Sequence, residues 1–164
     1  MNHVILHVGE AKESYFREAF AEYQKRMNAY GSLTSVAVRP AKTPGRALSA
    51  AEIEQALETE AREIEKLLDA PEYRKSYRIA LCIEGEGFSS EGLAGLFEQI
   101  AAKGHSRIVY LIGSSWGLAP RVKALCDLKL SFSPMTFAHS LFRVMLAEQI
   151  YRAASLSAGA KYHK

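Results

Sequence analysis

Hydrophobic residues in this chain alternate between short apolar runs and longer segments with helical spacing. The short runs predict strands at residues 3–9, 33–39, 77–83, 107–112 and 127–132. The longer segments predict helices at residues 13–29, 49–69, 89–102, 120–126 and 138–154. Because strands and helices alternate, we expect one α/β domain over residues 1–164, with a mainly parallel sheet covered by helices on both faces.

Capping residues mark several predicted helix ends. Gly31 lies just past the first helix, where a C-cap glycine belongs. Ser49 and Glu52 form the pattern of a capping box at the start of the second helix. Pro120 suits the first turn of a short helix, where its missing N–H is not needed. Residues 40–48, before Ser49, are predicted to form a loop of basic character.

Three loops follow successive predicted strands: Glu84–Phe88, Gly113–Leu118 and Ser133–Ala138. In open parallel sheets, ligands bind beyond the carboxyl ends of the strands. We therefore expect the three loops to meet in space and to form a binding site.

The last predicted helix is apolar nearly all round but carries four polar residues. At about 100° per residue, His139 and Arg143 share one side, and Glu148 and Arg152 lie on the opposite side. Glu148 and Arg152 can pair at i,i+4 spacing, whereas His139 and Arg143 need an anion or a carboxylate from elsewhere. The alternative is a structural ion pair plus a surface-exposed His–Arg edge.

Composition narrows the class of protein. The chain has 164 residues, 48% hydrophobic and 24% charged, which is enough for a compact core. Its apolar runs are shorter than the roughly 20 residues of a membrane helix, and residues 4–8 are too short for a signal peptide. We expect a cytoplasmic protein without membrane association, in which Cys82 and Cys126 are reduced thiols. The scattered His and Cys residues offer no metal-ligand spacing.

The net charge of +3 hides an asymmetry between the two parts of the chain. Residues 1–102 contain 12 Lys/Arg and 16 Asp/Glu, a balance of −4, whereas residues 103–164 contain 9 and 2, a balance of +7. A basic region of this kind suits nucleic-acid phosphates. The alternative is scattered charge on a solvated surface.

Residues 113–117, GSSWG, match the G-x-S-x-G nucleophile elbow of serine hydrolases. Asp127 and His139 follow in the order of a catalytic triad. In an elbow, however, the helix begins directly after the nucleophile, which would place Pro120 inside it at a cost of about 3 kcal/mol. We therefore discount a hydrolase.

Several segments together resemble a known family over the whole chain. They are VGEAKESYF, EYQKRM, LCIEGEGFSSEGLA, LIGSSWGL, LSFSPMTFAHSLFRVMLAEQIYRA and the final YHK. The chain resembles the RlmH family of SPOUT-class methyltransferases. The resemblance implies a C-terminal trefoil knot, an exception to the rule of unknotted folds, and a homodimer. It also implies methyl transfer from S-adenosylmethionine to N3 of a pseudouridine in 23S rRNA of the assembled ribosome, without a metal.

The resemblance also assigns roles to residues. It implies a cofactor pocket made of Leu81, Gly113, Ser114, Ser133, Pro134, Met135, Thr136, Phe137 and Ala138. It implies a catalytic group made of Arg143, Glu148, Arg152, Tyr162 and His163. RNA contacts are expected from His139, Arg143, Lys161 and Lys164.

Two positions depart from the family pattern, which usually has Gly-Gly at residues 113–114 and Pro at residue 138. If residue 114 needs a positive φ or a close backbone approach, Ser114 is strained and cofactor affinity falls. The alternative function is then a non-catalytic ribosome-binding or assembly factor on the same scaffold. Ala138 in place of Pro loosens the start of the last helix.

Overall fold

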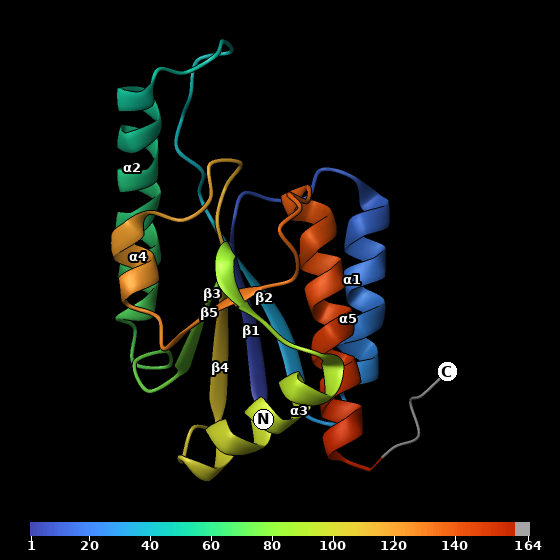
Figure 1. Ribbon diagram of the computed structural model, residues 1–164. Helices are drawn as coiled ribbons and strands as arrows, with labels where there is room; N and C mark the ends of the chain where they lie inside the picture. Colours follow the sequence, from blue (N-terminus) through green and yellow to red (C-terminus); the bar gives the residue numbers. More distant parts are fainter. Residues whose placement is uncertain (160–164) are drawn as a thin grey trace.

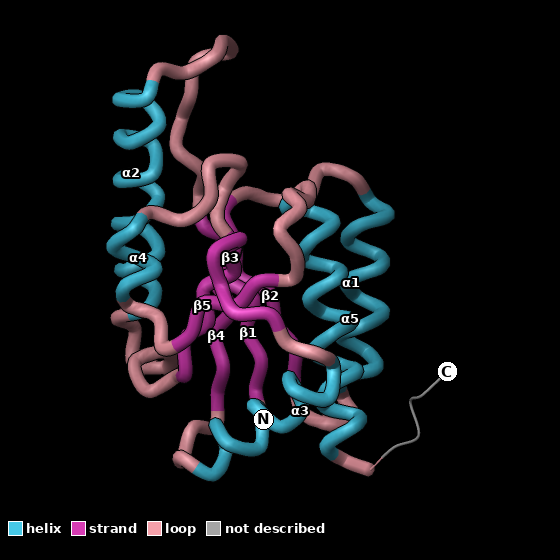
Figure 2. Tube along the Cα trace, viewed as in Figure 1, coloured by secondary structure: helices cyan, strands magenta, loops and turns pink. Residues whose placement is uncertain are grey.

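The computed structural model describes residues 1–159 as a parallel sheet between two layers of helices (Figures 1 and 2). The strands are β1 (Asn2–Val8), β2 (Ser32–Val38), β3 (Tyr77–Gly87), β4 (Arg107–Ile112) and β5 (Leu128–Ser131). The helices are α1 (Ser14–Met27), α2 (Ala50–Leu68), α3 (Ser90–Ala102), α4 (Pro120–Ala124) and α5 (His139–Ser157). The strand order is β2-β1-β4-β3-β5, with all pairs parallel. The predicted α/β class is confirmed.

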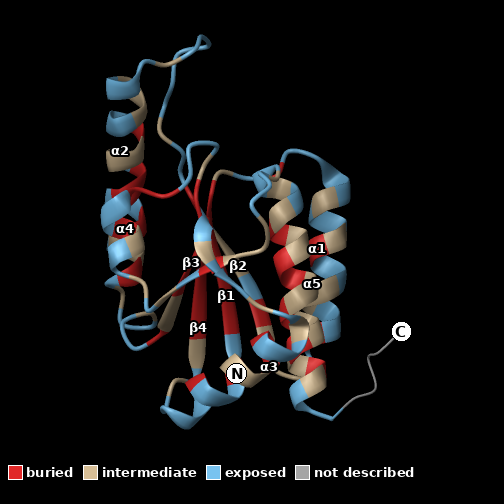
Figure 3. Cartoon of the chain, viewed as in Figure 1, coloured by how far each residue is buried: buried red, intermediate tan, exposed pale blue. Residues whose placement is uncertain are grey.

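Alternate residues of the central strands point to opposite helix layers, as a period of two requires. Ile5 of β1 and Tyr110 of β4 belong to the core beneath α1, α3 and α5. Leu6 and Leu111, the next residues along, belong to the core beneath α2 and α4. Burial is concentrated on the central strands (Figure 3). Strands buried on both faces explain why the sequence shows continuous apolar runs rather than alternation.

Serine side chains cap the starts of α2 and α3. The capping box of α2 is present: the Ser49 side chain accepts from the Glu52 amide, and the Glu52 carboxylate accepts from the Ser49 amide. Ser89 caps α3 through the Gly92 amide at 3.0 Å. α5 continues to Ser157, beyond the predicted end at residue 154, and α4 stops at Ala124. No helix within residues 1–159 is long and apolar enough to cross a bilayer.

β3 is longer than predicted because its end pairs twice with β5. Leu81 pairs with Leu130, and after a shift in register Glu86 pairs with Leu130 again. The intervening turn wraps around β5 so closely that a Cβ on Gly85 would lie 2.6 Å from the Leu130 carbonyl carbon. A two-glycine segment that looks like a loop therefore completes a strand.

Candidate functional site

Segments that follow or end three strands meet at the carboxyl end of the sheet and line one pocket of about 570 Å³. β3 supplies Leu81 to Glu84, the turn after β4 supplies residues 112–118, and the segment after β5 supplies most of residues 131–139. The loops Gly113–Leu118 and Ser133–Ala138 converge as expected, but of Glu84–Phe88 only Glu84 lines the pocket, because residues 85–87 continue β3 and Phe88 lines another cavity. Of the nine residues expected to hold a cofactor, all except Pro134 line this pocket.

The turn after β4 is tightly closed by two glycines. The Gly117 amide donates to the Ser114 carbonyl at 2.9 Å, and Gly117 has a φ of +81°. A Cβ on Gly113 would lie 2.1 Å from the Gly117 carbonyl oxygen, so that position excludes every other residue type. The pocket wall here is backbone, which can offer N–H and C=O groups to the edges of a ligand.

Ser114 is not strained. No non-glycine residue in the described part of the chain has a positive φ, so the positive-φ condition for strain at residue 114 is not met. The steric demand falls on Gly113, which this chain retains. The Ser114 hydroxyl is buried, and within residues 1–159 it has no hydrogen-bond partner. A buried hydroxyl without a partner is suited to bonding with a ligand.

Aromatic and apolar side chains form the rest of the pocket wall. Phe142 packs against Phe132 and Phe137, with ring centroids 4.8 and 5.8 Å away. Met135 is 70% exposed and Trp116 is 36% exposed at the mouth. Exposed apolar groups around a concave wall are typical of a binding site rather than a closed surface. Sequence reasoning did not assign Phe142 to the pocket, because its position on α5 looked like ordinary core.

One ion pair borders the pocket and was also missed. Lys123 of α4 contacts Glu84 with 2.5 Å between Nζ and Oε1. This hydrogen bond lowers the pKa of Glu84, so the carboxylate stays charged. No motif linked the two residues, since they lie on different elements.

Arg143 points away from the pocket and into the layer between β1 and α1. Its Nη1 donates to His7 Nε2 at 2.8 Å, its guanidinium lies 5.5 Å from the centre of the Phe20 ring, and Glu10 Oε2 is 3.9 Å away. The Arg143 side chain is only 6% exposed. The helical wheel correctly indicated that Arg143 needs an outside partner, but that partner is chiefly a neutral histidine.

The contact with Arg143 fixes the protonation state of His7. An arginine only donates, so His7 Nε2 accepts and Nδ1 carries the proton, which it donates to the Gly9 carbonyl at 2.6 Å. Burial and then Arg143 lower the pKa of His7. The alternative of a surface-exposed His–Arg edge is thus wrong for Arg143. His139, in contrast, is exposed and lines the pocket.

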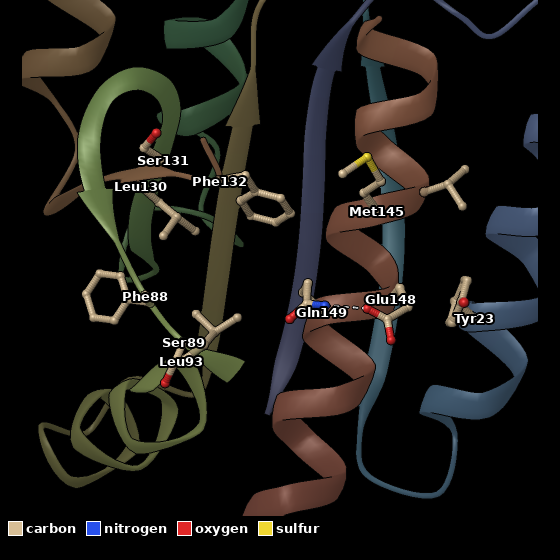
Figure 4. Close-up of a pocket in the computed structure, with 11 residues that line it drawn as sticks. Tyr23, Phe88, Ser89, Leu93, Leu130, Ser131, Phe132, Met145, Glu148 and Gln149 are labelled. Atoms are coloured by element: carbon tan, nitrogen blue, oxygen red, sulfur yellow. Dashed lines mark hydrogen bonds between the residues drawn. The ribbon is translucent and has the colours of Figure 1, made fainter. Parts of the chain in front are cut away.

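Glu148 and Arg152 form the predicted pair, with Nε and Oε1 2.9 Å apart. Glu148 lines a second cavity of about 430 Å³ between α5, α1 and the start of α3, next to the pocket at β5. Figure 4 shows Met145, Glu148 and Gln149 on α5 facing this cavity from one side, with Phe88 and Phe132 on the other. The structure therefore separates the expected catalytic residues: Glu148 borders the second cavity, and Arg143 is buried elsewhere.

The remaining expected residues, Lys161, Tyr162, His163 and Lys164, lie outside the described residues.

Ser115, Asp127 and His139 do not form the arrangement of a serine hydrolase. The turn at residues 113–117 is followed by Leu118 and Ala119 before α4 begins at Pro120, so no helix follows Ser115 directly. Asp127 accepts from the Arg78 amide at 2.7 Å, at the start of β3 and thus at the other end of the sheet. Within residues 1–159, no group of three or more His, Cys, Asp or Glu residues could hold a metal ion.

Comparison with known proteins identifies relatives over the full chain. The family model described as "Predicted SPOUT methyltransferase" matches residues 1–163. The chain is 42% identical over 165 residues to ribosomal RNA large subunit methyltransferase H of Bifidobacterium adolescentis, with 100% of each chain covered. It is 38% identical over 164 residues to the protein of that name in Clostridium acetobutylicum, again with 100% of each covered.

Solved structures share the fold. The crystal structure of a probable methyltransferase from Bordetella pertussis Tohama I matches with a TM-score of 0.51 and 15% sequence identity, covering 93% of this chain and 95% of that chain. At this identity, the similarity concerns the fold alone.

Proposed function

The chain belongs to the ribosomal RNA large subunit methyltransferase H family of SPOUT methyltransferases. On this basis, we propose that it methylates N3 of a pseudouridine in 23S rRNA on the assembled ribosome, with S-adenosylmethionine as methyl donor. The observation that carries the proposal is the meeting of three loops around one pocket at the carboxyl end of the sheet. Such an edge is where open parallel sheets bind nucleotide-like ligands.

The pocket suits S-adenosylmethionine on two counts. Gly113 lets the turn close on itself, because a Cβ there would lie 2.1 Å from the Gly117 carbonyl oxygen, and the closed turn offers its backbone groups to an adenosine. Ser114 presents a buried hydroxyl that has no partner within the described residues, and the aromatic wall around Phe137 and Phe142 can cover an adenine ring. When bound, the sulfonium supplies an already activated methyl group. The residues of this chain therefore act mainly by holding and aligning the reactants.

The RNA side of the site is proposed to begin at His139. This side chain is exposed at the first turn of α5, beside Ala138 and Met135 of the pocket wall. Glu148 and Arg152 would order the neighbouring surface, and Lys161 and Lys164 would contact phosphates. Tyr162 or His163 would take or shield the N3 proton. For Arg143, burial favours an indirect role: it fixes the start of α5 against β1 through His7.

We further propose a homodimer and the knot of the family. The second cavity and the exposed Leu141 leave part of α5 uncovered in one chain, which supports an interface between two copies. The double pairing of Leu130 with Leu81 and Glu86, which surrounds β5 on two sides, supports a threaded C-terminal segment. In a dimer, Tyr162 or His163 could act on the pocket of the partner subunit. We propose the cytoplasm as its location, since ribosomes are there.

Two measurements test this function. Calorimetry should detect S-adenosylmethionine binding to the protein alone. Mass spectrometry of 23S rRNA should show loss of one methylated pseudouridine in cells that lack the protein, and its return on complementation. Binding of ribosomes without any heat from S-adenosylmethionine would instead identify a non-catalytic ribosome-binding factor.

A further inference from the structure

Residues 39–49, here called the basic arm, leave β2 and rise beyond the sheet together with the first turns of α2 (Figure 1). The basic arm contains Arg39, Lys42 and Arg46 and no acidic residue. All three side chains are exposed. A local charge of +3 therefore sits within the part of the chain whose overall balance is −4.

The basic arm is held in a defined shape. At its tip, Arg46 contacts Glu52 through Nη2 at 2.6 Å, and the same carboxylate accepts from the Ser49 amide at 2.8 Å. The hydrogen bond from Arg46 and then those from Ser49 lower the pKa of Glu52 to about 2. At its base, the buried Glu60 accepts from the Ala41 amide at 3.2 Å. These hydrogen bonds at both ends of the basic arm favour a defined conformation over a loose loop.

Two of its three cations have no counter-charge. Within residues 1–159, neither Arg39 nor Lys42 has an ion pair or a side-chain hydrogen bond, whereas other exposed cations pair with α2. Arg121, for example, contacts Glu58 and Glu65 of that helix. Glu58 and Glu65 of α2 thus have cationic partners of their own. Arg39 and Lys42 stay available to an external anion.

The position of the basic arm relates it to the pocket. β2 ends at the same edge of the parallel sheet as β3, β4 and β5, so the basic arm rises from the edge where the pocket opens (Figure 1). A pseudouridine presented to the methyl donor beside His139 carries phosphodiester backbone on either side, and that backbone must leave across this end of the molecule. We propose that the basic arm binds the phosphodiester backbone of ribosomal RNA through Arg39 and Lys42. This inference rests on the proposed function, because it requires an RNA substrate.

The test compares two double variants: one neutralises Arg39 and Lys42, and the other neutralises two exposed lysines at the opposite end of the sheet. Arg39→Gln/Lys42→Gln should weaken binding to purified large ribosomal subunits by on the order of tenfold, and the slope of log affinity against log salt should shrink by about two. KM for subunits should rise while kcat and S-adenosylmethionine affinity stay unchanged. The matched control is Lys75→Gln/Lys103→Gln, whose exposed side chains lie at the amino ends of β3 and β4, and it should change none of these values.

The outcomes separate this inference from the proposed function. Equal subunit affinity for the two double variants would overturn the role of the basic arm, and so would a wild-type protein that binds no subunits. Wild type that binds subunits through the basic arm but transfers no methyl group would overturn only the proposed function. Thermal unfolding should be the same for both variants, since none of the four side chains is buried.

Discussion

The two ends of the parallel sheet differ in whether they open into a pocket. At the amino end, the Asn2 amide donates to the Ser106 carbonyl at 2.9 Å, and His3 Nδ1 lies 3.0 Å from the Tyr110 hydroxyl in the core. Arg107 Nε is buried there without a partner within residues 1–159, although Nη1 of the same side chain donates to the Glu72 carbonyl. At the carboxyl end, the buried Ser114 hydroxyl lines an open pocket and has no partner within the described residues, and Met135 of the same pocket is 70% exposed. The carboxyl end therefore presents a polar group and apolar side chains to a ligand.

The largest expected effect comes from breaking the carboxyl end at Gly113. Gly113→Ala places a methyl group 2.1 Å from the Gly117 carbonyl oxygen, so the turn must move. Methyl transfer should fall by about a hundredfold or more, because displacements of about 1 Å cost that much. Overpacking should also lower the free energy of unfolding by about 1–3 kcal/mol. A methyl-transfer assay measures the first effect, calorimetry with S-adenosylmethionine shows whether binding is lost with it, and denaturant unfolding measures the second.

Gly95→Ala is the matched control for this change. Gly95 lies within α3, and a Cβ there meets no heavy atom within 4 Å. Alanine should stabilise the helix by roughly 0.5–1 kcal/mol and leave ligand binding intact. Normal binding by the Gly113→Ala variant would show that the turn is not part of the site.

The second prediction concerns the close contact between Gly85 of β3 and the backbone of β5. Gly85→Ala puts a Cβ 2.6 Å from the backbone of Leu130 and should cost about 1–3 kcal/mol of unfolding free energy. Gly87→Ala, two residues along, has open space and should cost less than about 1 kcal/mol. Urea unfolding of the two variants compares them directly. If both lost the same stability, the close crossing would not be a real constraint.

At the amino end of the sheet, the prediction concerns how the free energy of unfolding depends on pH. Burial lowers the pKa of His3 from 6.5 to about 3, so the unfolded chain takes up a proton before the folded protein does. Stability from this residue is complete above pH 6.5 and is lost as pH falls toward 3, with a slope of up to about 1.4 kcal/mol per pH unit.

His3→Gln should flatten that dependence, since glutamine can still bond the Tyr110 hydroxyl but does not titrate. Some slope should remain, because the pKa of His7 is also lowered. Unfolding curves at several pH values measure this dependence. Identical pH profiles for wild type and variant would show that His3 is not its source.

The smallest expected effect is that of Ser114→Gly. The hydroxyl has no protein partner within the described residues, so its removal should leave unfolding free energy unchanged within about 0.5 kcal/mol. S-adenosylmethionine affinity should fall by about tenfold, because the lost hydroxyl is proposed to bond the ligand and such a bond is worth about 1.4 kcal/mol. Unchanged affinity in calorimetry would show that the hydroxyl does not contact the ligand.

Sequence patterns predicted what depends on near neighbours. The apolar runs located β1 and β4, and Ser49 with Glu52 located the start of α2. The same patterns also predicted that three loops would converge, because parallel strands place their carboxyl ends together.

What the sequence did not reveal depends on distant pairs. His7 and Arg143 are 136 residues apart, and no periodicity links them. The second pairing of Leu130 is equally non-local, so the end of β3 looked like a loop. The basic character of residues 40–48 was predicted, but their projection beyond the carboxyl edge of the sheet was not, because it depends on how β2 and α2 are placed in the fold.

The late position of β5 along the chain has a consequence for synthesis. β5 and the segment after it are translated later than the other four strands, yet they supply one wall of the pocket and the edge of the sheet. While about 5–20 residues are added per second, the portion that has emerged first has an unpaired β3 edge and lacks this wall. In a nascent chain, the pocket therefore stays incomplete until β5 and the segment after it have emerged.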